Sequence, residues 1–286
     1  MASFAFVLHP DRAEAAAVAL DTIDWLVAAG HQVLLPELDA ARLGRAELGV
    51  SEAGLGAGLD LAVSLGGDGT MLRTVALVAR HEVPVLGVNL GTLGYLTDIE
   101  PDGLRSALER VLAGEHLIEK RMLLEIDIEA PSGATSERNV LALNEAVLEK
   151  TGSGHTIRLD VALDGTFFTP YAADGLIVAT ATGSTAYAFS ARGPIVAPTH
   201  RALLLTPVSP HMLFDRTLVL EPSAEVRLVV QGHRPATVSV DGRNLGELGE
   251  GDAIVCTAAQ QRARLVSSVP RDFLARLKSK FGLEDR

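Results

Sequence analysis

An acidic residue inside a glycine turn is the feature of this sequence that points most directly to chemistry. Residues 66–70 read Gly-Gly-Asp-Gly-Thr, after an apolar run at 59–65 and before a helical pattern that starts at Met71. Glycines in such a turn permit positive φ and let a ligand approach the bare backbone, and the amides that begin the next helix donate to phosphate oxygens. Asp68 does not fit a turn that only binds phosphate, because its carboxylate and a phosphate are both negative. Like unit charges about 4 Å apart repel by ~4 kcal/mol at an effective dielectric of about 20. Its carboxylate therefore binds a metal, accepts a proton or points elsewhere, which favours phosphoryl transfer. The alternative is a tight turn in which Asp68 only caps the helix.

A small, hydroxylated turn further along the chain is the second candidate. A strand predicted at 176–180 leads into Thr182-Gly183-Ser184-Thr185 and then into Ala186-Tyr187. Such a turn presents amides and hydroxyls together, which suits ribose, amide or phosphate groups. Asp174, just before the strand, either binds a polar ligand or satisfies the preceding turn. Ordinary helix capping is the alternative for the whole segment.

Adjacent Asn144 and Glu145 are the third candidate. Asparagine offers both a donor and an acceptor, and a glutamate accepts two hydroxyls, so the pair could hold a vicinal diol. By themselves such neighbours are more often a solvated strand edge.

The elements that must position these residues change character near residue 117. Through about 116, short apolar strands alternate with amphipathic helices, which predicts an α/β domain with a Rossmann-like parallel sheet. Its strands are expected at 4–8, 31–35, 59–65 and 83–88. Asp11, with Glu14 three residues on, is predicted to cap the first helix. Ligands bind at the carboxyl ends of such strands, so the turn at 66–70 and the segment at 89–96 are expected to line one crevice.

The remainder of the chain reads as strands and turns. Residues 117–265 predict a β-rich domain of the sandwich type. The pairs Asp164-Gly165 and Asp241-Gly242 suit type I′ hairpin turns. Helical spacing returns within 266–286, which is expected to pack back on the first domain, 1–116.

The composition excludes several kinds of partner. The chain has 286 residues and a formal net charge of −11, which argues against nucleic acid and against an anionic membrane surface. A phosphate site must then be built locally from amides, a few cations and a metal. Cys256 is the single cysteine, so no disulfide framework is expected and the protein is predicted to work in a reducing cytoplasm. No segment approaches the ~20 apolar residues of a membrane span.

In their order and spacing, the segments together resemble a bacterial-type NAD kinase. The segments that carry the resemblance are GGDGT at 66–70, NLGTLGYL at 89–96, NEAVLEK at 144–150, DGLIVATATGSTAYAFSARGPIV at 174–196, TPVSPH at 206–211 and VDGR at 240–243. The resemblance covers nearly the whole chain, although GGDGT alone also occurs in lipid kinases and phosphofructokinases. It implies phosphorylation of the adenosine 2′-hydroxyl of NAD, with ATP or polyphosphate as donor and Mg²⁺ or another divalent metal, to give NADP.

The resemblance also implies roles for individual residues. Asp68 would accept the proton of the 2′-hydroxyl or orient that hydroxyl. Asn144 and Glu145 would hold ribose hydroxyls, Asp174 would contact the nicotinamide end, and Tyr95 would lie near the adenine. The other residues implied to contact NAD are Gly69, Thr182, Thr185, Ala186, Tyr187 and Ser190. The loop implied for the phosphate donor comprises Gly66, Gly67, Gly69 and Thr70. The metal ligands are not assigned.

Three departures from the family pattern give further expectations. Ala172 stands where many members carry an arginine, and the resemblance implies that this change removes a cation near the nicotinamide and relaxes the discrimination between oxidised and reduced cofactor. Ala181 replaces a common proline, which is expected to loosen the turn. Arg192 stands where a glycine is common, so the backbone there is expected to avoid conformations that need glycine. Family members form dimers or tetramers, and a homo-oligomer is expected here. Two alternatives remain open: a lipid or sphingoid-base kinase that shares GGDGT, and a dinucleotide-binding regulator without catalysis.

Overall fold

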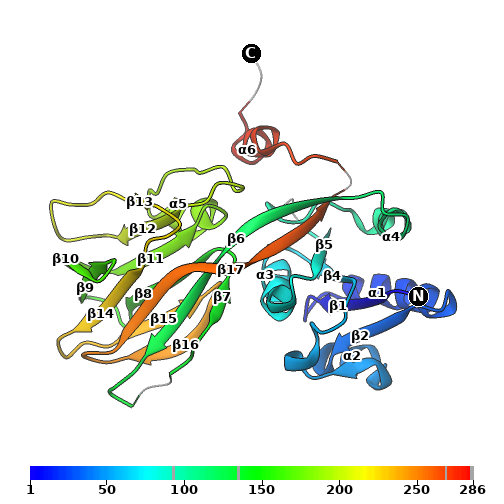
Figure 1. Ribbon diagram of the computed structural model, residues 1–286, viewed down its shortest axis with the longest axis horizontal. Helices are drawn as coiled ribbons and strands as arrows, with labels where there is room; N and C mark the ends of the chain where they lie inside the picture. Colours follow the sequence, from blue (N-terminus) through cyan, green and yellow to red (C-terminus); the bar gives the residue numbers. More distant parts are fainter. Residues whose placement is uncertain (92–93, 134–135, 268, 284–286) are drawn as a thin grey trace. The chain divides into compact units, whose positions relative to one another are not determined.

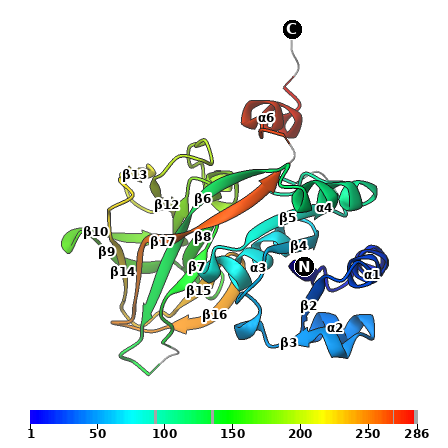
Figure 2. The same cartoon turned by 45° about the vertical axis from the view of Figure 1, so that its right-hand side comes forward.

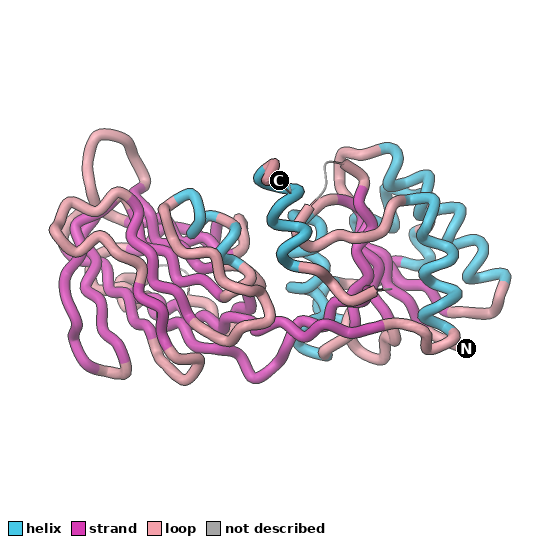
Figure 3. Tube along the Cα trace, turned by 90° about the horizontal axis from the view of Figure 1, so that it is seen from above, coloured by secondary structure: helices cyan, strands magenta, loops and turns pink. Residues whose placement is uncertain are grey.

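The computed structural model describes residues 1–91, 94–133, 136–267 and 269–283. The chain divides into two compact units. Unit 1 comprises Met1–Lys120 together with Gln261–Arg286, and unit 2 comprises Arg121–Gln260. Helices are concentrated in unit 1 and strands in unit 2 (Figure 3).

Unit 1 is built on a parallel sheet with the strand order β5-β4-β1-β2-β3 (Figure 1). Its strands are β1 (Ser3–Leu8), β2 (Gln32–Pro36), β3 (Gly49–Val50), β4 (Leu61–Gly66) and β5 (Pro84–Asn89). The end of β17 (Ala253–Ser267) adds to this sheet, because Arg264 and Leu265 pair in parallel with Pro84 and Val85 of β5. The central strands read as nearly continuous apolar runs, as expected where both faces of a parallel sheet are covered.

The helices of unit 1 follow the strands in alternation. They are α1 (Ala13–Ala28), α2 (Glu37–Leu43), α3 (Asp68–Val78), α4 (Leu104–Leu112) and α6 (Phe273–Phe281), with short 3₁₀ turns η1 (Ala46–Leu48), η2 (Glu52–Gly54), η3 (Ala79–His81) and η4 (Pro101–Gly103). Phe4, Phe6, Ile23 and Leu26 are among the buried side chains that form one apolar core from β1 and α1. The predicted Asp11 cap is wrong: α1 begins at Ala13 and no side chain caps it, because Asp11 lies one residue before the N-cap position.

The C-terminal segment is held to the loop after β5 by ion pairs and hydrogen bonds. The Arg271 side chain is buried and forms an ion pair with Asp98, Nε to Oδ2, at 2.6 Å. Arg276 of α6 donates to the Tyr95 carbonyl oxygen and to the Asp98 carboxylate. The Asp272 carboxylate caps the helix by accepting from the Ala275 N–H at 2.9 Å.

Unit 2 contains two antiparallel sheets that share one core. The first has the order β13-β12-β11-β8-β15-β16, and the second continues from β10 through β9 and β14 to β17, with β6 pairing to β17 and β7. Figure 2 shows β6 and β17 running alongside each other. The strands are β6 (Leu117–Glu129), β7 (Val140–Ala142), β8 (Glu145–Lys150), β9 (Ile157–Leu163), β10 (Thr166–Ala173), β11 (Gly175–Thr180), β12 (Leu203–Val208), β13 (Leu218–Leu220), β14 (Val226–Gln231), β15 (Ala236–Val240) and β16 (Arg243–Leu248); η5 (Gly183–Thr185) and α5 (Tyr187–Ser190) follow β11.

Buried side chains from both sheets meet in a single cluster, for example Leu148 and Leu176 from the first and Leu159 and Ile254 from the second. This is the arrangement of a sandwich. The predicted fold class, an α/β domain followed by a β-rich one, is therefore confirmed. Within the part of the chain that the structure describes, no helix is long and apolar enough to cross a bilayer.

The two predicted Asp-Gly hairpin turns are confirmed. Asp164 and Gly165 have φ of 50° and 73°, and Asp241 and Gly242 have φ of 47° and 78°. Positive φ at both central positions is what a type I′ turn requires. The second of these turns also serves the candidate site.

Candidate active site

The glycine turn of unit 1 joins β4 to α3 without using left-handed backbone. Gly66, Gly67 and Gly69 all lie in the described part of the chain and none has a positive φ, so the turn does not use the left-handed conformations that glycine permits. Gly66 is required for a different reason, because a Cβ there would lie 2.2 Å from the Thr70 Oγ1. A Cβ at Gly67 or Gly69 would meet nothing within 4 Å. The turn therefore leaves open space beside the backbone at these two positions, which is what close approach of a ligand needs.

Asp68 reaches across to the segment that follows β5. Its Oδ2 accepts from the Tyr95 N–H at 2.8 Å and its Oδ1 from the Leu96 N–H at 3.0 Å. Its side chain makes no capping bond to α3, so the capping alternative is wrong. Gly94 permits this approach, since a Cβ there would lie 2.2 Å from the Asp68 Oδ1. The two loops predicted to line one crevice are thus in contact through Asp68. Thr92 and Leu93 of the second loop lie outside the described residues.

A hollow of about 230 Å³ lies beside the open glycines. It is lined by Leu8, His9, Pro10, Arg12, Gly67, Gly69, Thr70 and Arg73. Arg73 is engaged by Asp39 at 3.2 Å and by Glu52 at 3.0 Å. Arg12 forms no ion pair among the described residues, and its guanidinium lies so close to Gly91 that a Cβ there would be 2.7 Å from its Nη1. Sequence reasoning missed Arg12. The available signal was its place just after β1, the neighbour of β4 in the sheet.

In unit 2, the start of β8 is held by a carboxylate far away in the sequence. Asp241 accepts from the N–H groups of Leu143 at 2.7 Å, Asn144 at 2.8 Å and Glu145 at 3.1 Å. Burial raises the pKa of Asp241, although these donors favour its charged form. Sequence reasoning placed Asp241 only in a hairpin turn. The structure shows that the same turn orients both candidate residues Asn144 and Glu145.

Glu145 is buried and only partly satisfied. Glu145 is 7% exposed, and its carboxyl group accepts from the Tyr187 N–H. Its Oε2 has no hydrogen-bond partner among the described residues. Burial, followed by the nearby charge of Asp241, raises the pKa of Glu145 to about 8. The alternative of a solvated strand edge is therefore wrong. A buried carboxyl oxygen without a partner costs free energy, and a ligand hydroxyl would satisfy it.

The hydroxylated turn after β11 packs against the residue before β8. The Thr180 Oγ1 donates to the Leu143 carbonyl oxygen at 2.5 Å and accepts from the Gly183 N–H at 3.2 Å. Arg121 donates to the Thr182 Oγ1 at 3.2 Å. A Cβ on Gly183 would lie 2.2 Å from the Asn144 carbonyl oxygen. These bonds hold the turn although Ala181 replaces the common proline, and the loosening expected there stays a prediction.

The remaining predicted residues of unit 2 form a second group at the other end of the β8–β11 pair. Asp174 precedes β11 and forms an ion pair with Lys150 of β8 at 2.7 Å. Tyr187 connects the two groups, because its N–H reaches Glu145 whereas its hydroxyl is hydrogen-bonded to Glu149. Tyr187 and Ser190 also line a hollow of about 740 Å³. Thr185 and Ala186 lie between them and the fixed turn.

Arg192 adopts the conformation that it was expected to avoid. Its φ is 66°, in the left-handed region. The reason is the end of α5: the Arg192 N–H donates to the Phe189 carbonyl oxygen at 2.9 Å and the Gly193 N–H to the Ala188 carbonyl oxygen at 2.8 Å. Such paired bonds close a helix through one left-handed residue, which is usually glycine.

No protein cage for a metal ion is present among the described residues, because no three His, Cys, Asp or Glu side chains converge there. Magnesium at phosphoryl-transfer sites usually takes one or two carboxylates, with water and substrate phosphates completing its shell. Asp68 at the open glycine turn fits that limited requirement.

An α/β unit with a glycine turn open to phosphate, and a β-sandwich unit with a buried acid, fit a phosphotransferase that acts on a hydroxyl. The family model for the ATP-NAD kinase N-terminal domain matches residues 4–116, and that for the ATP-NAD kinase C-terminal domain matches 143–268. The chain belongs to the NAD kinase family, which confirms the resemblance seen in the sequence.

Relatives named NAD kinase are similar in sequence to this protein over most of the chain. The NAD kinase of Heliobacterium modesticaldum is 41% identical, covering 98% of this chain and 98% of its own length. That of Moorella thermoacetica is also 41% identical, covering 92% of this chain and 83% of its own length.

Solved structures have the same fold. Yeast NADH kinase complexed with NADH superposes with a TM-score of 0.90 at 27% identity, covering 100% of this chain and 89% of its own. An NAD kinase from Archaeoglobus fulgidus in complex with ATP gives a TM-score of 0.72 at 24% identity, covering 98% and 97%.

Proposed function

We propose that this protein transfers a phosphoryl group from ATP to the 2′-hydroxyl of the adenosine ribose of NAD, giving NADP. The observation that carries the proposal is the geometry of Asp68, a carboxylate fixed by two backbone N–H groups beside glycines with open backbone. An ionised carboxylate has about four lone-pair sites, so those two bonds leave acceptor capacity for a substrate hydroxyl.

Asp68 is assigned the role of accepting or orienting the proton of the 2′-hydroxyl. Phosphoryl transfer requires mainly positioning and charge neutralisation, and a placed base typically contributes roughly 10² to 10⁴-fold. Rigid placement supports this role, because the carboxylate is held at both oxygens and hemmed in by Gly94.

The phosphate groups of the donor are assigned to the hollow beside the turn. Gly66, Gly67, Gly69 and Thr70 form the donor loop, and Arg12 adds a cation that neutralises phosphate oxygens. A divalent metal, Mg²⁺ in the first instance, would neutralise charge on the transferring phosphoryl group. Asp68 would be a ligand of that metal only if it orients the 2′-hydroxyl and does not accept its proton. Polyphosphate is the alternative donor, because backbone donors and a guanidinium recognise phosphate chains of either kind.

The acceptor is assigned to the carboxyl, amide and hydroxyl groups of unit 2, with Tyr95 of unit 1 at the adenine. Asn144 and the free Oε2 of Glu145 hold ribose hydroxyls, and Asp174 contacts the nicotinamide end. The remaining residues proposed to line the NAD site are Gly69, Thr182, Thr185, Ala186, Tyr187 and Ser190. The orientation of Asn144 and Glu145 by Asp241 supports this assignment, because a preorganised pair loses little freedom when it binds a diol.

The test is NADP formation by the purified protein with NAD and Mg²⁺, using ATP and polyphosphate in separate reactions. Wild type is expected to form NADP, and Asp68→Asn to bind NAD normally but lose roughly 10² to 10⁴ in kcat. Asp102→Asn, an exposed carboxylate of the same unit, is the matched control and is expected to behave as wild type.

Each contrary result has a specific meaning. Unchanged turnover in Asp68→Asn removes this residue from the mechanism. NAD binding without NADP from either donor favours the regulator alternative. The lipid-kinase alternative is already disfavoured by family membership over both units.

We propose in addition that the protein is a homodimer or homotetramer. Phe167 and Phe168 of β10 are 61% and 41% exposed, and Phe168 lies edge-on to Phe214 at 5.9 Å between ring centroids. Exposed aromatic groups of this kind favour burial in an interface. Phe168→Asp is expected to lower the mass measured by light scattering, whereas Leu38→Asp, at a more exposed apolar site in unit 1, is not. A monomeric wild type contradicts the proposal.

A further inference from the structure

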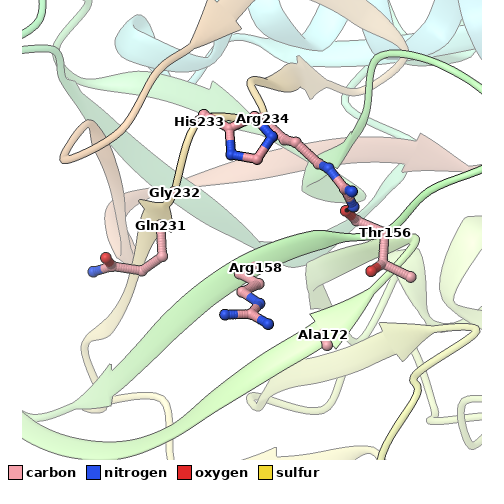
Figure 4. A pocket seen from close by; sticks show the side chains of 7 residues that line it. All are labelled: Thr156, Arg158, Ala172, Gln231, Gly232, His233 and Arg234. Carbon is pink, nitrogen blue, oxygen red and sulfur yellow. Dashed lines mark hydrogen bonds between the residues drawn. The ribbon is translucent and has the colours of Figure 1, made fainter.

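A second hollow, in unit 2, is lined by positively charged side chains and by none of the residues to which a contact with NAD or the phosphate donor is assigned above. It has a volume of about 330 Å³ and is lined by Thr156, Arg158, Ala172, Gln231, Gly232, His233 and Arg234. Figure 4 shows the Arg158 guanidinium in the middle of the group, with Arg234 extending from the far side toward Thr156. The chain carries a net charge of −11, so a local excess of cations needs its own explanation.

Strand pairing places Arg158 at the centre. Arg158 of β9 is directly opposite Ala172 of β10 on one side and Gln231 of β14 on the other. Residues directly opposite one another share a face of the sheet. The methyl side chain of Ala172 leaves space beside the guanidinium, and this space forms part of the hollow.

Arg234 is fixed in position but keeps most of its donors. Its Nη1 donates to the Thr156 carbonyl oxygen at 2.9 Å, which anchors the guanidinium across the hollow. The carbonyl is neutral, so the positive charge of Arg234 is not cancelled. A guanidinium has five N–H donors in a planar fork, and such a fork matches phosphate oxygens.

The carboxylate beside this face is directed elsewhere. Asp160, two residues after Arg158 on β9, accepts from the Gln231 Nε2 at 2.8 Å. Neither Arg158 nor Arg234 forms an ion pair with a carboxylate among the residues that the structure describes. Exposed arginines with ordinary hydration are the simple alternative. That alternative does not explain why two guanidinium groups line one concavity with no carboxylate among its lining residues, because like charges repel.

We propose that this hollow binds a small phosphorylated metabolite through one or two phosphate groups, at a site separate from those for NAD and the phosphate donor. Its volume lies at the lower end of the range for small-ligand pockets, which fits a compact anion and not a dinucleotide. The two arginines are the phosphate ligands, with His233 and the Thr156 hydroxyl available at the rim.

The experiment uses inorganic pyrophosphate as the probe, titrated calorimetrically into the full-length protein. Two binding components are expected, one at this hollow and one at the donor hollow of unit 1. Arg158→Ala and Arg234→Ala should each weaken the first component at least 10-fold and leave the second, and Arg12→Ala should do the reverse. Arg201→Ala removes an exposed arginine of unit 2 outside the hollow and is expected to change neither. Orthophosphate in a parallel titration reports whether one phosphate group suffices.

Three outcomes would overturn the proposal: wild type with no component sensitive to Arg158 or Arg234, an equal loss in Arg201→Ala, or displacement of this component by saturating NAD. Displacement would place the hollow within the cofactor site. The assignment of catalysis is tested separately, since kcat of Arg158→Ala at saturating NAD and ATP is expected to equal that of wild type.

Discussion

The two functional turns of this molecule use the same residue type in opposite ways. In unit 1, Gly67 and Gly69 leave their backbone open, with nothing within 4 Å of an added Cβ. In unit 2, Gly183 is closed against the Asn144 carbonyl oxygen, 2.2 Å from an added Cβ. The first turn is shaped to receive a ligand and the second to fix its own neighbours. A glycine-rich segment therefore has to be judged by what surrounds each Cα.

The acidic residues differ in the same way. Asp68 has both oxygens held by N–H groups of the adjacent loop, whereas Glu145 is buried with one oxygen unsatisfied. The carboxyl group of Asp68 is placed by the fold before any ligand arrives, and that of Glu145 still lacks a hydrogen-bond partner on one oxygen. This contrast is what the proposed roles of base and ribose ligand require.

The largest expected effect comes from disturbing Asp68 through its neighbour. In Gly94→Ala the new methyl would overlap the Asp68 Oδ1, and a shift of about 1 Å in a catalytic group can cost roughly 10²-fold in rate. We expect kcat to fall by about that factor while the Kd for NAD stays within a few-fold. Gly103→Ala is the control, because its Cβ would lie 3.5 Å from Ile99. Equal kcat in both variants would mean that Asp68 need not be held.

The next effect separates the two turns by stability. Gly183→Ala forces a methyl into a backbone carbonyl and is expected to lower the free energy of unfolding by about 1–3 kcal/mol. Gly67 has φ −103° in open space, so Gly67→Ala should change stability by less than about 0.5 kcal/mol and instead raise the KM for ATP. Denaturant unfolding of both variants checks this. Equal losses of stability would contradict the distinction between an open and a closed turn.

A third prediction concerns Glu145 and pH. Because its pKa is about 8 in the folded protein, against an ordinary value near 4.5, the folded state binds a proton that the unfolded state lacks between these values. The contribution of Glu145 is therefore fully present below about pH 4.5 and is lost as the pH rises to about 8. Relative to Glu145→Gln, wild type should lose at most about 1.4 kcal/mol of stability per pH unit across this window.

Urea unfolding at several pH values measures that difference, with Glu250→Gln, an exposed glutamate of the same unit, as the control. A difference that stays constant from pH 5 to pH 8 would show that Glu145 titrates normally. Glu145 would then titrate as an exposed glutamate does.

The smallest expected effect is at Arg192. A non-glycine residue at φ 66° destabilises the folded state by roughly 1–2 kcal/mol. Glycine avoids this strain, but its unfolded chain has more conformational freedom, which offsets part of the gain. Arg192→Gly should therefore raise stability by about 0.5–1 kcal/mol, measured as a small rise in Tm, and Arg192→Ala should not. A lower Tm for the glycine variant would mean that the arginine side chain stabilises the fold by contacts of its own.

Features that depend on near neighbours in the chain were predictable from the sequence. The alternating apolar pattern of unit 1 gave β1, β4 and β5 to within two residues, and the Asp-Gly pairs gave both type I′ turns. Apolar periodicity and turn preference act within a few residues, so a single sequence displays them. The same holds for the candidate pair Asn144 and Glu145 and for the turn containing Asp68.

The partners of these residues were not predictable, because they are distant along the chain. Asp68 is held from 27 and 28 residues away, and the Asn144 N–H is held by Asp241 from 97 residues away. Arg12 lies next to the glycine turn only because β1 and β4 are neighbours in the sheet. Local rules also failed where a helix end decided the backbone, as at Arg192.

The discontinuity of unit 1 bears on how the protein emerges from the ribosome. Arg271 and Arg276, which fasten Asp98 and Tyr95, are translated only after all of unit 2. The intervening stretch from Arg121 to Gln260 takes roughly 7–30 s at about 5–20 residues per second. During that interval, the loop that positions Asp68 lacks its bonds to Arg271 and Arg276. Unit 2, whose sequence is uninterrupted, can fold first, so the part of the chain that is synthesised earliest is the last to be completed.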